Sequence, residues 1–290
     1  QRWRIGSGVS RPAPRQQLRT GGTVLGVAWL VGVAALSLGV PSWSLTRLLL
    51  ESRRTELDVG ELAGAVVGSA SSSILGAALA LLLALPIAAL AARYRSRIVR
   101  SIEGAAFLGH ALPGVVVGLS LVFLTLAVLP AAYQTLAVLA FAYAVLFLPK
   151  AIGSSRSAIA HVPPGLESTA RSLGRGPLRA WCTVTGRLAW PGIAAGTLLV
   201  VLTAMKELPA TLMLRPTGFN TLATELWSRT EIQAFGSAAP YALTMIVLAS
   251  VPAWLMGRWM ARSPETAART DRADDEMVRT DEVAYVGGVR

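Results

Sequence analysis

Long apolar runs alternate with short polar segments along most of the chain. Six of these runs approach the roughly 20 residues that a helix needs to cross a bilayer. They predict transmembrane helices at about residues 23–40, 62–92, 104–129, 131–152, 188–208 and 238–260. The alternating segments of about ten residues that mark a transmembrane barrel do not occur in the sequence. The pattern therefore predicts an all-α, polytopic membrane protein.

Small residues and prolines add detail to these runs. Every fourth position near the start of the second run is small, namely Gly64, Gly68, Ser72 and Gly76. This spacing lets a neighbouring helix approach closely. Pro113 and Gly114 predict a kink inside the third run; a border of a transport pathway and plain helix packing explain that kink equally well. Pro41 is expected to end the first helix.

Composition and charge agree with a membrane protein and suggest its orientation. The chain is 53% hydrophobic and 15% charged, whereas a soluble domain carries about 25% charged residues. The net charge of +11 does not require nucleic acid as a partner, because basic residues on cytoplasmic loops set membrane topology. They concentrate in residues 1–21, 93–100 and 153–187, with Lys150 counted in the last group, and at the end of the sixth run. Six spans with both termini in the cytoplasm are predicted.

The two ends of the chain are predicted to lie outside the lipid. Residues 1–21 are basic and broken by prolines, which favours a cytoplasmic arm or linker. A signal peptide is the alternative, but no small-residue cleavage site follows the apolar run. Residues 263–290 are polar and are predicted to form a disordered cytoplasmic tail. The chain begins at Gln1, which suggests a processed chain or a piece of a longer one.

Motifs of covalent chemistry are missing from the sequence. It contains no phosphate-cradling G-x-x-x-x-G-K-[ST], no H-E-x-x-H and no G-x-S-x-G. A single cysteine, Cys182, excludes an intrachain disulfide, and His110 and His161 lie in different segments. Nothing pairs a nucleophile with a base, as an intramembrane enzyme would require. If nucleotide hydrolysis drives transport, the motor is expected to be another subunit.

The polar segment 153–187 has the features of a docking element. Pro163 and Pro164 break the preceding helix, and Glu167 then lies in a first helical turn, where a carboxylate is favourable. Apolar residues follow at helical spacing, and Gly174 and Gly176-Pro177 end the helix. A second short helix is predicted over 178–184. We therefore expect a helix-turn-helix-like element that seats on a partner protein.

This segment resembles the cytoplasmic loop of the membrane permease subunits of ABC importers. Their EAA motif reads E-A-A-x-x-x-G, followed after nine residues by I-x-L-P. Ala170 and Gly174 match the second alanine and the glycine, whereas Ser168 and Thr169 replace the first two positions and Glu167 stands one place early. The end of the motif is also altered, to Val184, Thr185, Gly186 and Arg187. The resemblance implies a type I ABC importer permease fold, with a six-helix permease domain over 22–262 and a coupling loop at 153–187. It implies ATPase-coupling residues Glu167, Ser168, Thr169, Ala170, Leu173 and Gly174.

A second stretch narrows the family. Residues 205–216 read M-K-E-L-P-A-T-L-M-L-R-P, which looks like the corresponding segment of the ferric-iron permeases. The resemblance implies transport of ferric iron and the C-terminal half of a fused permease, or an equivalent separate subunit. Thiamine, phosphonate, polyamine and sulfate are alternative substrates of the same architecture. A self-contained secondary transporter or channel is the alternative of another class, but it would need intramembrane charge pairs.

The family resemblance also implies the partners and the location. Two cytoplasmic ABC ATPase subunits would hold ATP and Mg, a second permease half would complete the pathway, and an external binding protein would deliver the substrate. The chain itself would bind no cofactor, perform no catalysis and contact no nucleic acid. It would be a multi-pass protein of the bacterial inner membrane.

Ionisable residues near the outer end of the fifth run are candidates for substrate handling. Lys206 and Glu207 lie there, and ionisable groups near membrane depth are often functional. Ferric iron prefers oxygen ligands, so Glu207, helped by Thr211, is the expected external gate and the tentative metal ligand. Pro113 and Gly114 complete this set of pathway residues. The alternative is that Lys206 and Glu207 snorkel to the membrane surface. Weaker candidates are Tyr133, Tyr143, Glu225 and Glu231.

Overall fold

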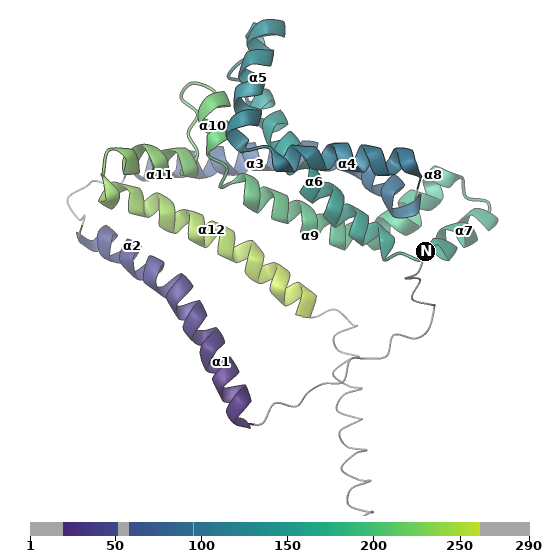
Figure 1. The fold of residues 1–290 in the computed structure, drawn as a ribbon, viewed down its shortest axis with the longest axis horizontal. Helices are drawn as coiled ribbons and strands as arrows, with labels where there is room; N and C mark the ends of the chain where they lie inside the picture. Colours follow the sequence, from purple (N-terminus) through teal and green to yellow (C-terminus); the bar gives the residue numbers. More distant parts are fainter. Residues whose placement is uncertain (1–19, 52–57, 95, 262–290) are drawn as a thin grey trace, which may run out of the picture.

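The computed structural model describes residues 20–51, 58–94 and 96–261, and every regular element in these ranges is helical (Figure 1). The predicted all-α class is confirmed. Four helical stretches are long and apolar enough to cross a membrane, over 20–50, 59–93, 136–160 and 177–204, and a bent helix pair over 97–128 raises the number to five. A shorter apolar stretch covers Phe235–Ser250. Six spans and cytoplasmic termini remain predictions; residues 1–19 and 262–290 lie outside the described ranges.

The first helical stretch is longer than expected. It comprises α1 (Thr20–Ala34), a π-helical segment (Ala35–Gly39) and α2 (Val40–Glu51). The prediction that Pro41 ends the helix was wrong. A proline ring normally clashes with the carbonyl four residues earlier, and here that carbonyl, of Ser37, lies in the π-helical segment, where the backbone is wider. The helix therefore continues past Pro41, and α2 packs against α12 (Phe235–Ala261) while α1 runs away from the other helices (Figure 1).

Three helices form the centre of the fold. The 35-residue helix α3 (Val59–Arg93) packs along α6 (Leu136–Ala160), and α9 (Arg187–Ala204) packs on both. Gly76 allows the close approach of α3 and α6, because a Cβ atom there would lie 2.6 Å from Cβ of Tyr143. Gly68 likewise lies directly against the backbone oxygen of Asn220, whereas Gly64 faces open space. The close packing predicted from the small residues is thus found at two of the glycines.

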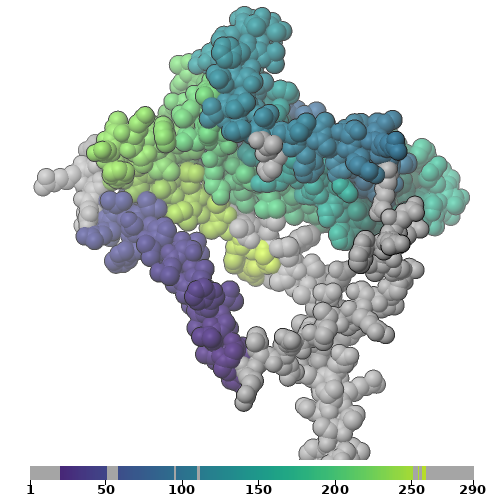
Figure 2. Space-filling view, viewed as in Figure 1, coloured from purple at the N-terminus to yellow at the C-terminus, as the bar shows by residue number. Residues whose placement is uncertain are grey.

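The third predicted span is broken rather than kinked. Helix α4 (Arg97–Ala111) begins earlier than expected, behind the N-cap Ser96, and α5 (Gly114–Val128) starts after Pro113. The two axes differ by 96°. Helix α4 packs against α6. Helix α5 instead projects from the body of the molecule, as the space-filling view shows (Figure 2). The break places the start of α5 beside α10 (Pro209–Leu214).

The segment 153–187, predicted as a coupling loop with a helix-turn-helix-like element, is mostly helical. Helix α6 continues to Ala160, eight residues beyond the predicted end of the fourth span. Helix α7 (Pro164–Ser172) follows, and α8 (Pro177–Ala180) continues through a π-helical segment (Trp181–Gly186) into α9. The short second helix predicted over 178–184 is therefore part of the same helical stretch as the fifth span. Helix α11 (Leu222–Glu231) then lies between α10 and α12 along the chain.

Candidate functional site

The break between α9 and α10 brings together two groups of residues that the sequence proposed for a pathway. Glu207 lies in the short connection before α10, where its Oε1 accepts a hydrogen bond from the backbone N–H of Ala210, at 3.2 Å. A Cβ atom on Gly114 would lie 2.6 Å from the same oxygen. The carboxylate of Glu207 therefore rests against the first turn of α5, although 93 residues separate it from Gly114 in sequence.

Local chemistry explains this arrangement. The first N–H groups of a helix have no partners within the helix and carry partial positive charge, so a carboxylate is favourable beside the starts of α5 and α10. Leu112, the residue before Pro113, is extended with φ −85° and ψ 131°, as a following proline favours, so the chain leaves the helical path of α4 there. Gly118, one turn further along α5, lets the backbone of α10 approach, because a Cβ atom there would lie 3.1 Å from Cα of Ala210.

Thr211 supports this connection from the protein interior. Its hydroxyl donates to the backbone oxygen of Glu207 at 2.6 Å. Tyr143 of α6 lies 2.6 Å from the same hydroxyl and is the donor, since the single hydroxyl hydrogen of Thr211 is already used. Both side chains are buried. The hydroxyl of Thr211 thus binds the backbone of Glu207 and does not bind its carboxylate.

Two lysines lie near this connection. Lys206 is exposed, and the ion pairs found among the described residues do not include it. The charge of Lys150 was counted with the basic loop that follows the predicted span 131–152, and the structure places this residue inside α6, ten residues before the helix ends. Its ammonium donates to Thr203 of α9 at 2.9 Å and lies 6.0 Å from the ring of Phe147. The positive charge of Lys150 therefore lies beside Thr203, four residues before Glu207 in the sequence.

Among the described residues, Glu207 is not part of a ready-made metal centre. Within the described ranges, His, Cys, Asp and Glu side chains do not gather in groups of three or more that would hold a metal ion. Glu207 thus offers a single carboxylate, and its tentative role as a ligand for the transported ion stays a prediction.

The predicted coupling residues lie on α7 and face in two directions. Glu167 points inward: its Oε2 accepts from the hydroxyl of Thr185 at 2.9 Å and lies 3.9 Å from Nη2 of Arg93. Ala170 is buried beneath the helix. Ser168 and Thr169 are exposed, and both hydroxyls donate to the backbone oxygen of Gly165.

Gly174 ends α7 through its backbone. Its φ of +84° lies in the left-handed region, where a side chain is strained. The N–H of Gly174 donates to the oxygen of Arg171 and the N–H of Arg175 donates to that of Ala170, at 3.0 and 3.2 Å. This pair of bonds is the Schellman motif. The glycine predicted from the family motif therefore has a structural reason, the chain reversal after the helix.

Exposed leucines and arginines surround this chain reversal. Leu166, Leu173 and Leu178 are all exposed, the last two by 79% and 76%. Basic residues on the same elements are exposed as well: Arg171, Arg175 and Arg179. We call these six residues the coupling surface. Its mixture of apolar and positively charged groups is suited to a partner that offers an apolar hollow with acidic surroundings.

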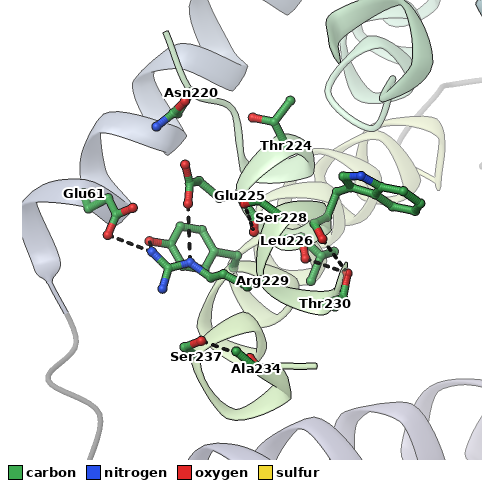
Figure 3. Close-up of polar contacts among 12 residues, drawn as sticks. Glu61, Asn220, Thr224, Glu225, Leu226, Ser228, Arg229, Thr230, Ala234 and Ser237 are labelled. Atoms are coloured by element: carbon green, nitrogen blue, oxygen red, sulfur yellow. Dashed lines mark hydrogen bonds and ion pairs between the residues drawn. The ribbon is translucent and has the colours of Figure 1, made fainter. Parts of the chain in front are cut away.

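A charged cluster ties α11 to its neighbours at the opposite end of α3 (Figure 3). Arg229 pairs with Glu61 of α3 at 2.7 Å and with Glu225 at 3.4 Å. It also donates to the hydroxyl of Tyr241 at 3.0 Å, and its guanidinium carbon lies 4.6 Å from the centre of that ring. One arginine thus joins three helices. The sequence analysis missed this cluster; Glu225 alone appeared there, as a weak candidate for substrate handling.

The charge balance of this cluster predicts a pH effect. Burial, and then the negative charge of Glu61, raise the pKa of Glu225, while Arg229 opposes the rise. Because the pKa is higher in the folded state, the stabilisation is fully present below the ordinary glutamate value and is lost as the pH rises through the folded value. Glu225→Gln removes this dependence. We expect the unfolding midpoint of wild type, compared with that of the variant, to fall as the pH rises from 4 to 8. Each kcal/mol of lost folding stability lowers the midpoint by about 2–4 °C.

Thermal unfolding of the detergent-solubilised protein measures this difference. Glu231→Gln on the exposed end of the same helix is the matched control and should leave the pH profile unchanged. Parallel profiles for wild type and Glu225→Gln would contradict the assignment.

Comparison with known proteins identifies a matching protein family. Residues 80–262 match the sequence model of the family described as "Binding-protein-dependent transport system inner membrane component". The chain is 35% identical over 259 residues to the Fe(3+)-transport system permease protein FbpB 2 of Haemophilus influenzae, and the match covers 88% of this chain and 51% of that protein. It is 30% identical over 132 residues to the molybdenum transport system permease protein ModB of Escherichia coli strain K12, with 44% and 58% covered.

Solved structures with the same fold are found as well. An inward-facing structure of the MetNI methionine ABC transporter contains a chain that aligns with a TM-score of 0.58 at 15% identity, over 70% of this chain and 96% of that one. A bacterial alginate ABC transporter aligns with a TM-score of 0.57 at 17% identity, over 84% and 95%. These likenesses concern the fold. The chain spans about half the length of the iron-transport relative.

Proposed function

The chain belongs to the family of binding-protein-dependent transport system inner membrane components, and we propose that it forms one half of the translocation pathway of an ATP-driven importer. It is an ABC importer permease and a multi-pass protein of the bacterial inner membrane. The proposed partners are two cytoplasmic ABC ATPase subunits, a second permease half and an external substrate-binding protein. ATP and Mg would bind to the ATPase subunits, and this chain would perform no catalysis.

The coupling surface is the observation that carries this proposal. Leu173 and Leu178 are large apolar side chains exposed on a polar, basic element, and such residues often mark protein–protein contacts. The inward ion pair of Glu167 and the buried Ala170 fix α7 on its own chain, which leaves the leucines and arginines for the ATPase. Closure of the ATPase subunits on ATP would then move α7 and switch the pathway between inward-open and outward-open states.

Glu207 is proposed as a gate residue on the external side. Its carboxylate lies where α9 gives way to α10 and where α5 begins, so movement of any of these helices changes its position. Thr211 and Tyr143 hold the connection from beneath. Lys206 is exposed beside Glu207 in the chain and is proposed to face the external solution.

Ferric iron is the proposed substrate. The support is the 35% identity to a relative named for Fe(3+) transport and the carboxylate of Glu207, whose oxygen atoms suit a hard cation. Iron would be cargo that passes Glu207, and no resident metal centre is proposed.

An oxyanion is the second candidate, because Lys150 places an ammonium inside a predicted span. A lysine at this depth attracts an anion and repels a bare ferric ion. Relatives named for molybdenum transport match a shorter part of the chain. Molybdate, sulfate and phosphonate share the required negative charge.

Uptake in proteoliposomes separates these candidates. The chain is reconstituted with its partner subunits and its binding protein, and uptake of radioactive iron, molybdate and sulfate is compared. We expect ATP-dependent iron uptake, reduced at least tenfold in Glu207→Gln and retained in Lys150→Gln. Molybdate or sulfate uptake that is lost in Lys150→Gln would instead establish the oxyanion. Absence of ATP-dependent uptake of each of the three ions would contradict both assignments.

A further inference from the structure

Helix α3 carries a charged side chain at each end and none between them. Its 35 residues include Glu61 in the first turn and Arg93 at the last position. The separation of 32 residues corresponds to about 48 Å along a helix. Charges at the ends of a transmembrane helix often only snorkel into water. In this chain both charges instead bind other helices of the same protein.

Arg93 binds the start of the coupling element. Its Nη1 donates to the backbone oxygen of Val162 at 3.0 Å, and Nη2 lies 3.9 Å from the carboxylate of Glu167. The side chains of Arg93 and Glu167 are only 17% and 24% exposed. Arg93 thus holds both the turn before α7 and the first turn of α7 itself.

The surroundings of Arg93 make this pairing demanding. Its Nε and Nη2 atoms are buried and have no hydrogen-bond partner among the described residues. A guanidinium that has lost water on these atoms depends on a nearby negative charge, because an unpaired buried charge is strongly unfavourable. Glu167 is the one carboxylate that forms an ion pair with Arg93 in the described part of the chain. Glu167 also accepts from Thr185, which fixes the carboxylate between α3 and the π-helical segment that leads into α9.

The opposite end of α3 binds the external segment. Glu61 pairs with Arg229 at 2.7 Å, as Figure 3 shows. Two turns further along α3, Ser69 accepts a hydrogen bond from the N–H of Leu222 at 2.7 Å, and Gly68 lies directly against the backbone oxygen of Asn220. The start of α11 therefore rests on α3. This segment follows α10, and the first turn of α10 donates a hydrogen bond to the carboxylate of Glu207.

The middle of α3 also contacts the candidate gate. Gly76 packs on Tyr143, and Tyr143 donates to Thr211 of α10. A displacement of α3 along or about its axis therefore reaches α10 by two routes, through Tyr143 and through the α11 segment. Close packing of this kind transmits small movements, because interiors have few voids to absorb them.

We propose that Arg93 and Glu61 are positioning residues that make α3 the mechanical link between the coupling helix and the external gate. Arg93 makes α3 follow α7, and Glu61 makes the α11 segment follow α3. This inference rests on the proposed function and deepens it, since it assigns the route by which ATPase movement reaches Glu207. Neither residue contacts the substrate or the ATPase in this scheme.

Charge reversal tests the link in the complete transporter. The complex with both ATPase subunits, the second permease half and the binding protein is placed in nanodiscs, and the ratio of ATP hydrolysis with and without loaded binding protein is measured. We expect Arg93→Glu to lower the stimulated-to-basal ratio at least fivefold. Glu167→Arg alone should do the same, and the combined exchange should restore at least half of the wild-type ratio. Arg93→Lys should be nearly normal, and Glu61→Gln should reduce the ratio.

Arg100→Glu provides the matched control. Arg100 is exposed on α4, on the same basic side of the chain, so its reversal changes the net charge equally without touching α7. Its stimulated-to-basal ratio should equal that of wild type. A reduction as large as that of Arg93→Glu would overturn the proposal, because a general charge effect would then explain both.

Hydrogen exchange of the amides in 164–172 supplies a readout that does not depend on transport. Arg93→Glu should speed this exchange, and the combined exchange of Arg93 and Glu167 should slow it again. Unchanged exchange would show that Arg93 and Glu167 do not hold α7 in place, and would overturn the proposal. Faster exchange with a normal stimulated-to-basal ratio would show that Arg93 is merely structural, and would also overturn the proposal. If loaded binding protein does not stimulate ATP hydrolysis by the wild-type complex, the proposed function is contradicted instead. The exchange result would still test whether Arg93 and Glu167 hold α7 in place.

Discussion

Leu173→Glu is expected to abolish stable binding of the ATPase subunits while the chain still inserts and folds. Leu173 is 79% exposed after the end of α7, so the substitution removes little of the packing of the isolated chain. A leucine that becomes buried on docking contributes about 1.5–3 kcal/mol, and a buried, unpaired carboxylate adds a further cost. The combined effect predicts at least a hundredfold weaker association.

Co-purification of the ATPase subunits with the solubilised permease measures this loss. The matched control is Ile232→Glu, since Ile232 is 75% exposed but follows α11, at the other end of the molecule from α7 (Figure 1). The control should retain the ATPase subunits at the wild-type level. Wild-type co-purification by Leu173→Glu would remove the main support for the coupling surface and hence for the proposed function.

Part of the helical pattern was predictable from the sequence, because burial in lipid requires long, uninterrupted apolar runs. Apolar length alone located the cores of α3, α6 and α9. The ends were less predictable, since a helix that continues beyond the membrane loses its apolar signal. Helix α6 continues through Ser154 to Ala160 in this way, eight residues beyond the predicted end of the fourth span.

Prolines were harder to interpret, because a proline acts according to the contacts around it. Pro149 lies inside α6 without ending it. Its ring leaves the backbone oxygen of Val145 without its usual helical partner, and Gly109 of α4 packs at that oxygen, where a Cβ atom would lie 3.2 Å away. Pro113, by contrast, separates two helices by 96°. The sequence indicated a bend there, but the angle depends on α10, which comes much later in the chain.

The candidate site was partly predictable for a similar reason. Glu207 and Gly114 were each selected on local grounds, as an ionisable residue near a span end and as a member of a proline-glycine pair. Their contact requires both helix breaks to form, which no local pattern encodes. Arg93 was hidden among neighbouring arginines, because the positive-inside rule counts charges together and does not show which one binds a partner. Thr185 had no signal except its place in an altered motif.

Gly114→Ala is expected to impair transport strongly while leaving the fold intact. The added methyl group would lie 2.6 Å from Oε1 of Glu207, so the carboxylate must leave the start of α5. The end of a glutamate side chain moves at little cost, and Gly114 has no positive φ that would strain an alanine. Wild-type thermal stability and ATPase binding are therefore expected, together with substrate uptake at least tenfold lower.

The contact between the two residues can be tested by compensation. Glu207→Asp shortens the side chain by one methylene group, so the double variant with Gly114→Ala should recover part of the lost uptake, whereas Gly114→Ala with Glu207→Gln should not. Gly153→Ala is the matched control, because Gly153 lies on α6 with no neighbouring atom within 4 Å of the added methyl group. Full uptake by Gly114→Ala would mean that the position of the Glu207 carboxylate does not control the pathway, and Glu207 would then be a cap for α10 alone.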